Sequence, residues 1–174
     1  MAVQIIVDST ADFSAKEIEK RQITCIPMTV TFGNEQYIDG VDLTKEEFFV
    51  KLTNEKEFPK TSQPSPAKFA DCFEEAKENG DDVVAILVSG ALSGTVQSAT
   101  IAKDIAEHDG VYIVDSKSAT LGIRLLVDRA VRMRDQGKSA KEIAEALDKL
   151  KARVRLFAGL DTLEYLQKGG RIGK

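Results

Sequence analysis

The sequence has no tryptophan, a single histidine (His108) and only two cysteines (Cys25 and Cys72) among 174 residues. A structural zinc site needs about four His or Cys ligands, so this class of site is excluded. The two cysteines lie far apart in the chain and form no Cys-x-x-Cys pair, so neither a disulfide framework nor a dithiol motif is supported. We therefore expect a fold held by its apolar core, with no metal and no cofactor.

Long apolar runs are missing as well. No stretch approaches the roughly 18 residues that a membrane-spanning helix requires. The first apolar run, residues 3–7, ends at Asp8 and carries neither a basic leader nor a cleavage-like end, so it does not resemble a signal peptide. The sequence predicts a cytoplasmic protein without stable membrane insertion.

Positive charge is not concentrated in any long run. The chain has 24 Lys and Arg residues against 28 Asp and Glu residues, a formal net charge of -4. A protein that binds nucleic acid in general must neutralise many phosphates, and this balance offers no such surface. With 43% hydrophobic residues, the chain can bury roughly 70% of its unfolded surface, which is enough for one core.

Strand-like and helix-like patterns alternate along the chain. Capping boxes begin helices at Ser14, Thr44 and Ser139, and Ser65 followed by Pro66 begins another. Further helices are expected at residues 93–107, 118–134 and 162–167, and residues 54–65 are expected to be a polar connection. Strands are expected at residues 3–7, 23–32, 37–38, 83–88, 111–114 and 154–160.

This alternation predicts an α/β fold, with an open, mainly parallel sheet and helices packed on it. The continuous apolar runs at 83–88 and 111–114 are typical of strands covered on both faces. Pro27 cannot donate a backbone hydrogen bond, so the strand at 23–32 should be an edge strand or contain a bulge.

Three of the expected strands end in small polar residues. In a parallel sheet these carboxyl ends meet at one edge, where ligands bind. The three segments are Asp8-Ser9-Thr10, Ser89-Gly90-Ala91-Leu92-Ser93-Gly94-Thr95 and Asp115-Ser116. We therefore expect Asp8, Ser9, Asp115 and Ser116 to line a crevice.

The segment Ser93-Gly94-Thr95 falls where a helix begins and free N–H groups face outward, which suits an anion. The alternative, that Ser93 and Thr95 only cap their own helix, stays open. Two prolines stiffen the segment Thr61-Ser62-Gln63-Pro64-Ser65-Pro66, so that it could hold two hydroxyls in place or simply connect two elements.

Two catalytic interpretations are weighed against binding. Asp8 stands where an aspartyl-phosphate nucleophile would stand, so an aspartyl-phosphate phosphotransferase or phosphatase is the alternative function. However, Asp81 and Asp82 precede their strand and belong to the opposite end of the sheet. A serine hydrolase using Ser93 needs a base, and His108 also falls at the far end, where it is expected to cap a helix.

Taken in order, several segments together resemble the DegV family of bacterial fatty-acid-binding proteins. They cover nearly the whole chain: Asp8-Ser-Thr-Ala-Asp12, Pro27 to Gly33, Tyr37-Ile-Asp-Gly-Val-Asp42, Thr61-Ser-Gln-Pro-Ser-Pro66, Leu92-Ser-Gly-Thr95 with Gln97-Ser-Ala99, Asp115-Ser116, Leu163-Glu-Tyr-Leu166 and Lys168-Gly-Gly-Arg-Ile172.

The resemblance implies a binding protein that is not itself an enzyme. It would hold one long-chain fatty acid and present its carboxylate to a separate fatty acid kinase subunit related to dihydroxyacetone kinases. By position, Thr61 and Ser93 are implied as carboxylate ligands, with the neighbouring Ser62 and Thr95 in the same motifs. The N–H of Gly94 is a further donor, and Arg171 is implied near the ligand mouth or the kinase contact.

Members of that family continue past the Gly-Gly-Arg-Ile motif into a second half that covers the acyl chain. We therefore expect residues 1–160 to form the N-terminal α/β domain and residues 161–174 to begin a second domain that is largely missing. An apolar face left uncovered in this way favours dimerisation.

Overall fold

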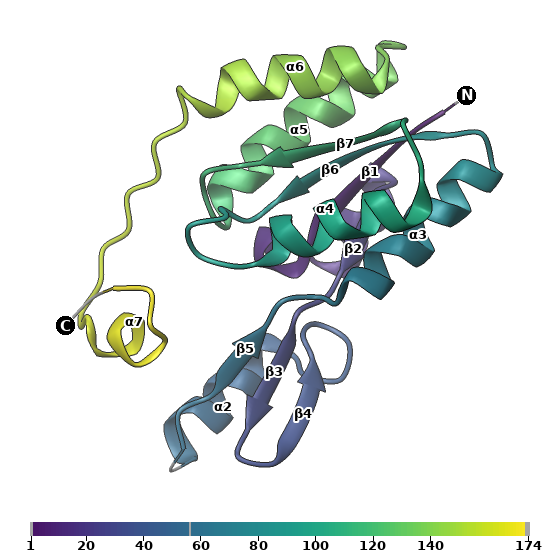
Figure 1. The fold of residues 1–174 in the computed structure, drawn as a ribbon. Coiled ribbons are helices and arrows are strands. Elements are labelled where there is room, and N and C mark those ends of the chain that lie inside the picture. The colour runs from purple at the N-terminus through teal and green to yellow at the C-terminus, as the bar shows by residue number, and fades with distance from the viewer. Residues whose placement is uncertain (1, 56, 173–174) are drawn as a thin grey trace.

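The computed structural model describes residues 2–55 and 57–172, and Figure 1 shows their arrangement. The last two residues of the predicted terminal turn, Gly173 and Lys174, lie outside the described residues. In chain order the elements are β1 (Val3–Asp8), the 3-10 helix η1 (Ser9–Ala11), α1 (Ala15–Arg21), β2 (Thr24–Ile26), β3 (Thr29–Phe32), β4 (Glu35–Ile38), α2 (Lys45–Asn54), β5 (Lys60–Ser62), α3 (Pro66–Glu78), β6 (Asp82–Leu87), α4 (Thr95–Ala106), β7 (Val111–Asp115), α5 (Leu121–Asp135), α6 (Ala140–Lys151) and α7 (Glu164–Lys168).

A four-stranded parallel sheet forms the centre of the fold, in the order β2-β1-β6-β7. Helices cover both of its faces (Figure 1). Because side chains alternate along a strand, Ile6 packs with Phe69 and Phe73 of α3, whereas Ile5 and Val7 belong to the cluster around α5 and α6. The expected α/β fold with a mainly parallel sheet is confirmed.

Helix starts follow the sequence signals closely. The Ser14, Thr44 and Ser139 side chains each accept a hydrogen bond from the backbone N–H three residues later, and a glutamate at that position completes a capping box. Ser65 caps α3, and Pro66 occupies its first turn. These four helix starts are confirmed.

A smaller antiparallel sheet, in the order β4-β3-β5, carries α2 on one side (Figure 1). Its separate core consists of Val30, Phe32 and Leu43, with Tyr37 and Phe48 packed against them. The chain leaves the parallel sheet after β2, forms the small sheet and α2, and then returns through α3 to β6 of the parallel sheet. The small sheet therefore projects from the carboxyl end of the larger sheet.

The single strand expected at residues 23–32 is wrong. It divides at Pro27 into β2, an edge strand of the parallel sheet, and β3, the central strand of the small sheet. Proline has no N–H to continue a ladder, and the next N–H, of Met28, donates to the Ser9 hydroxyl at 3.0 Å instead. The polar connection at 54–65 also needs correction, because it contains β5, which pairs with β3.

The strand expected at residues 154–160 is wrong as well. This segment runs from α6 to α7 without strand or helix structure, and Figure 1 shows it as an extended trace outside the layers. A strand needs a neighbour to pair with, and none lies alongside it in the described part of the chain. The short helix expected at 162–167 is present as α7 and is shifted to Glu164–Lys168.

Candidate functional site

The three polar strand ends meet as expected. β1, β6 and β7 are adjacent and parallel, so Asp8, the turn that follows β6 and Asp115 lie at one edge of the sheet. The small sheet projects from this same edge, and α7 lies beside it (Figure 1). The space between these elements is where a ligand would bind in an open α/β sheet.

A pocket of about 530 Å³ occupies this space, within the size range of small-molecule sites. It brings together three of the predicted ligand residues: Thr61 from β5, Ser93 from the turn before α4, and Arg171 from the end of the described chain. The other lining residues are Thr10, Asp12, Met28, Val30, Asp39, Lys45, Phe48, Phe49, Val88, Leu92, Ala119 and Leu166.

Thr61 faces the pocket because β5 pairs with β3, with Thr61 opposite Val30. The Arg171 guanidinium donates to its hydroxyl, Nη2 to Oγ1, at 3.4 Å. Ser62, the next residue of the same strand, points the other way and does not line the pocket. Of the two hydroxyls in the Thr-Ser-Gln-Pro segment, the fold therefore presents one.

Ser93 and Thr95 form a hydroxyl pair, with their side-chain oxygens 2.8 Å apart. Thr95 is completely buried and also contacts the Met28 sulfur at 3.9 Å, so its role is to hold Ser93 in position. The N-cap of α4 is Gly94, and no side chain caps this helix among the described residues. The alternative that Ser93 and Thr95 serve as caps is therefore wrong.

Gly94 itself lies against the Gln63 side chain. A Cβ at this position would stand 2.7 Å from Gln63 Nε2, so the glycine allows the Thr61 segment and the Ser93 turn to approach each other. Gly94 is not among the residues that line the pocket, and the donor role of its N–H stays a prediction.

The two positively charged side chains of the pocket, Lys45 and Arg171, differ in whether they have a carboxylate partner. Lys45 Nζ forms an ion pair with Asp12 Oδ1 at 2.6 Å, which ties α2 to the turn after β1. Arg171 has no carboxylate partner in the described part of the chain, since its guanidinium bonds only the Gly169 carbonyl and Thr61. A guanidinium left in this way can bind an anionic group.

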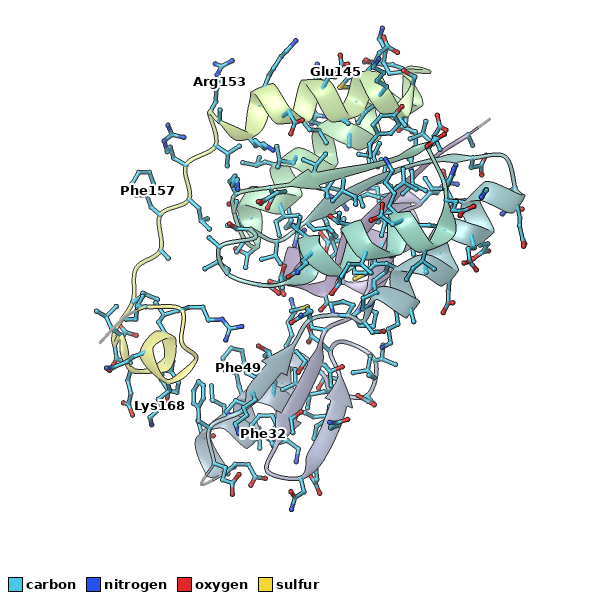
Figure 2. The ribbon with its side chains drawn as sticks, in the orientation of Figure 1. Phe32, Phe49, Glu145, Arg153, Phe157 and Lys168 are labelled. Atoms are coloured by element: carbon cyan, nitrogen blue, oxygen red, sulfur yellow. The ribbon has the colours of Figure 1, made fainter. Side chains whose placement is uncertain are left out.

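The apolar side of the pocket comes from residues that sequence reasoning did not assign to the site. Phe48 packs against Phe32, with ring centroids 5.8 Å apart, whereas Phe49 is 62% exposed and borders the pocket (Figure 2). The signal was available, since two adjacent aromatic residues on one short helix cannot both face the same core.

Asp8 and Ser9 do not line the pocket, contrary to expectation. The Asp8 carboxylate is fully buried and accepts hydrogen bonds from the backbone N–H of Val88 at 2.8 Å, the N–H of Thr10 at 3.0 Å and the Thr10 hydroxyl. Burial raises the pKa of this carboxyl, partly offset by these bonds. Asp8 therefore joins two strand ends, and a phosphoryl donor has no access to it.

Asp115 and Ser116 are likewise structural rather than crevice-lining. Asp115 accepts from the N–H groups of Gly90 at 3.3 Å and Lys117 at 2.9 Å, and forms an ion pair with the Lys117 ammonium at 2.7 Å. Although burial raises the pKa of Asp115, these contacts lower it overall. Ser116 is buried and donates to the Ser118 carbonyl.

Two further cavities adjoin the pocket. One, of about 520 Å³, shares Leu92 and Ala119 with it and extends to Val154 and Leu156. The other, of about 900 Å³, shares Phe48, Thr61 and Arg171 with it and is bordered by α7, whose Tyr165 ring lies 5.8 Å from that of Phe58. The polar end of the pocket thus opens into apolar space in two directions.

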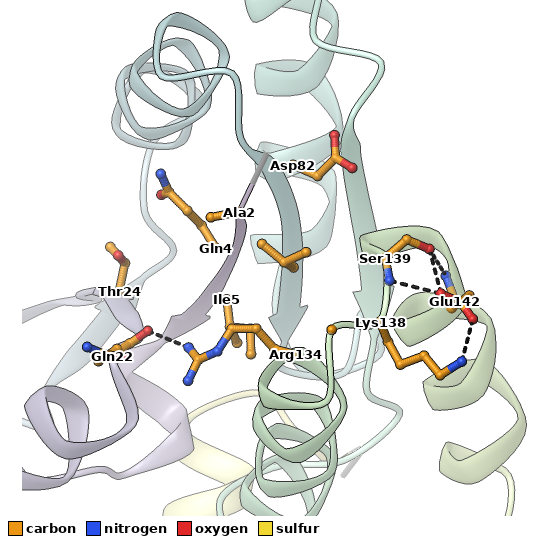
Figure 3. Close-up of a pocket in the computed structure, with 12 residues that line it drawn as sticks. Ala2, Gln4, Ile5, Gln22, Thr24, Asp82, Arg134, Lys138, Ser139 and Glu142 are labelled. Atoms are coloured by element: carbon orange, nitrogen blue, oxygen red, sulfur yellow. Dashed lines mark hydrogen bonds and ion pairs between the residues drawn. The ribbon is translucent and has the colours of Figure 1, made fainter.

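The opposite end of the sheet carries a cavity of about 670 Å³, shown in Figure 3, whose arginine and lysine already have partners. Arg134 donates to the Gln22 carbonyl at 2.8 Å, and Lys138 pairs with Glu142 at 2.8 Å. His108 lies at the same end, bonded to the Asp81 carbonyl at 2.9 Å. As predicted, this histidine is far from Ser93.

The described residues contain no group of three or more His, Cys, Asp or Glu side chains placed to hold a metal ion. None of the helices described is long and apolar enough to cross a membrane.

The fold is an α/β fold of parallel-sheet type, and its candidate site combines hydroxyls and charged side chains with an apolar wall. The chain belongs to the DegV family, a family of uncharacterised proteins, whose model matches residues 2–174. It is 37% identical over 172 residues to a DegV domain-containing protein of Caldanaerobacter subterraneus, covering 99% of this chain and 61% of that protein.

Two of the solved structures that are similar to this chain illustrate the match. A stearic-acid-binding protein from Eubacterium ventriosum matches with a TM-score of 0.91 and 38% identity, over 100% of this chain and 61% of that one. The B3 protein of the Streptococcus pneumoniae fatty acid kinase, loaded with linoleic acid, matches with a TM-score of 0.74 and 27% identity, over 87% and 55%. The chain thus spans about 61% of the length of the curated relatives that it matches.

Proposed function

We propose that this chain binds one long-chain fatty acid and holds its carboxylate between Thr61 and Ser93. The observation that carries the proposal is the convergence of these two hydroxyls and the Arg171 guanidinium on one apolar-walled pocket. Arg171 is 110 residues from Thr61 in sequence, yet it donates to the Thr61 hydroxyl. A carboxylate entering here replaces a weak hydroxyl contact with charge-assisted hydrogen bonds.

The chemistry of the donors suits presentation rather than turnover. Two hydroxyls and the free N–H groups of α4 can satisfy a carboxylate without enclosing both of its oxygens, which leaves a lone pair open to a phosphoryl group. The chain is then a lipid-binding protein and not an enzyme, and a separate fatty acid kinase subunit related to dihydroxyacetone kinases forms the acyl phosphate. The similarity to a B3 protein of the fatty acid kinase supports this partner.

The acyl chain would continue from the pocket into the cavity that shares Leu92 and Ala119 with it. Each buried CH₂ contributes about 0.8 kcal/mol, so the tail supplies most of the affinity and the polar end supplies the orientation. Val154 and Leu156 supply further apolar lining of this cavity.

Mass spectrometry of the purified protein under native conditions tests the proposal. We expect one fatty acid per chain, recovered by solvent extraction and absent after delipidation. A full-length DegV relative purified in parallel controls for lipid lost during handling. An empty chain beside a loaded relative, with no uptake of added fatty acid, would contradict lipid binding by this chain.

The route of the acyl chain gives a separate prediction. Leu92→Asp places a carboxylate where the two cavities join, and an unpaired charge beside an acyl chain is costly. We expect fatty-acid affinity to fall by at least about tenfold in a fluorescent fatty-acid titration. Ile101→Asp is the matched control, since Ile101 on α4 is 43% exposed and Leu92 is 39% exposed. Equal affinities in the two variants would place the acyl chain elsewhere.

A further inference from the structure

The Thr95 side chain has two hydrogen-bond neighbours and only one hydrogen to donate. It is completely buried, and its hydroxyl oxygen lies 2.8 Å from Ser93 Oγ and 3.9 Å from Met28 Sδ. A threonine hydroxyl carries a single O–H and two lone pairs, whereas a methionine sulfur can only accept. The Thr95 hydrogen therefore goes either to Ser93 or to Met28.

The direction of the hydrogen bond between Ser93 and Thr95 follows from this choice. In the structure Thr95 donates to Met28 Sδ, so in its contact with Ser93 it accepts and Ser93 donates. The one hydrogen of Ser93 is thus directed at Thr95, which is buried and does not line the pocket. An ionised carboxylate can only accept hydrogen bonds, so Ser93 must turn its hydrogen into the pocket before it can bind one.

We propose that Met28 and Thr95 are positioning residues for the carboxylate site, an inference that rests on the proposed function. Together with Ser93 they form what is here called the hydroxyl chain, which has two states. In the state that the structure shows, Ser93 donates to Thr95 and Thr95 donates to the Met28 sulfur. In the second state, which a carboxylate stabilises, Thr95 donates to Ser93 and Ser93 donates to the carboxylate. Rotation of two hydroxyls converts one state into the other, and no covalent bond changes.

A thioether suits this position because it is a weak acceptor. Thr95 loses little when its hydrogen turns from the Met28 sulfur to Ser93. The carboxylate then gains a charge-assisted hydrogen bond from Ser93, and the Thr95 bond behind Ser93 polarises this donor and strengthens it. A strong acceptor in place of the sulfur would hold the Thr95 hydrogen and oppose binding. Met28 therefore keeps the reversal of the chain inexpensive.

The backbone of Met28 is held on both sides, which keeps its sulfur beside Thr95. Its N–H donates to the Ser9 hydroxyl at 3.0 Å, and its carbonyl accepts from the N–H of Asp39 at 3.0 Å. The Met28 side chain is 6% exposed and borders the pocket. Ser9, which does not line the pocket itself, thus acts on the site through Met28.

The affinities for stearic acid and for its methyl ester, each measured by displacement of a fluorescent fatty acid, test the reversal. The ester keeps the acyl chain but lacks the charged carboxylate, so the ratio of the two affinities isolates the polar end. We expect Thr95→Val to lower this acid-over-ester ratio by about fivefold, because the donor behind Ser93 is lost. Met28→Leu, which conserves volume, should raise the ratio by about twofold, because Thr95 can then donate only to Ser93.

The double variant distinguishes the hydroxyl chain from two separate packing effects. Without the Thr95 hydroxyl the sulfur has no hydrogen to accept, so Met28→Leu should have no effect on the ratio in the Thr95→Val background. Thr95→Ser keeps the hydroxyl and should keep the wild-type ratio. Ser98→Ala is the matched control, since it removes another buried hydroxyl of α4 that does not line the pocket.

The outcomes separate the reversal from the proposed function. A wild-type ratio in Thr95→Val, an equal loss in Thr95→Ser, or a Met28→Leu effect that persists in the double variant would overturn the reversal alone. If Thr95→Val does not fold, a Met28→Leu ratio at or below that of the wild type has the same meaning. A wild-type chain that binds neither stearic acid nor the fluorescent fatty acid would instead overturn the proposed function, and the reversal with it.

Discussion

Replacing Thr61 and Ser93 together with alanine is expected to leave the purified protein without fatty acid. Each hydroxyl that donates to a carboxylate contributes about 1.5 to 3 kcal/mol, so the loss of both should weaken binding by about 100-fold or more. Native mass spectrometry gives the occupancy, and titration with a fluorescent fatty acid gives the affinity.

The matched control for this double variant is Ser62→Ala. Ser62 follows Thr61 on β5, and its exposed side chain does not line the pocket, so this variant should bind as the wild type does. Thermal unfolding of both variants should stay near that of the wild type, because neither Thr61 nor Ser93 is a core residue. If the double variant retains as much lipid as Ser62→Ala, the carboxylate lies elsewhere.

The position of this pocket could be predicted from the sequence because parallel strands fix which ends meet. Asp8, Ser93 and Asp115 follow three apolar runs, and the α/β alternation places their carboxyl ends at one edge once these strands are neighbours, as β1, β6 and β7 are. The resemblance to a family added Thr61 and Arg171, which no local pattern connects. Their contact depends on α7 docking beside β5, a tertiary arrangement between residues 110 positions apart.

Which of the polar residues at the strand ends face the pocket, and which bond the backbone, could not be predicted in this way. A carboxylate or a hydroxyl at a strand end can face a ligand or bond a neighbouring backbone, and the residue type is the same in both cases. Asp8 accepts a hydrogen bond from the N–H of Val88, and Asp115 accepts one from the N–H of Gly90, both in the segment that follows β6. Ser93, by contrast, lines the pocket. Whether such a side chain faces the pocket or bonds a neighbouring backbone depends on the three-dimensional position of its turn.

The two incorrect strand predictions, at residues 23–32 and 154–160, have a common physical reason. Apolar, β-branched runs show that a segment can form a strand, but pairing requires a partner at the correct distance. At residues 23–32 one run serves two sheets, because Pro27 cannot continue the first ladder. At residues 154–160 the run has no neighbouring strand in the described part of the chain.

Asp8→Asn is expected to reduce the stability of the fold and to change how stability depends on pH. The two Asp8 carboxylate oxygens accept from different donors, Thr10 N–H at one and Val88 N–H at the other. An amide offers an oxygen to only one of them and turns an NH₂ group toward the other. The unpaired buried N–H should lower the free energy of unfolding by about 2 kcal/mol.

The pH dependence follows from the direction of the pKa shift. Burial raises the pKa of Asp8 above its ordinary 3.8 in the folded protein. Between 3.8 and that raised value, the folded state holds more protons than the unfolded state, so the Asp8 contribution to stability is complete below the window and declines as pH rises through it. Asparagine does not titrate, so the variant lacks this decline and its deficit is largest at about pH 4.

Urea unfolding from about pH 4 to about pH 8 measures both effects. Asp12→Asn is the control, because it removes an exposed carboxylate four positions away at a left-handed residue that asparagine tolerates. It should cost less than about 1 kcal/mol, the usual value of a surface ion pair. If the Asp8→Asn variant keeps the wild-type decline with pH, a different group is responsible. If its stability is unchanged, the hydrogen bonds of Asp8 do not hold the strand ends together, and the buried carboxylate has lost its structural explanation.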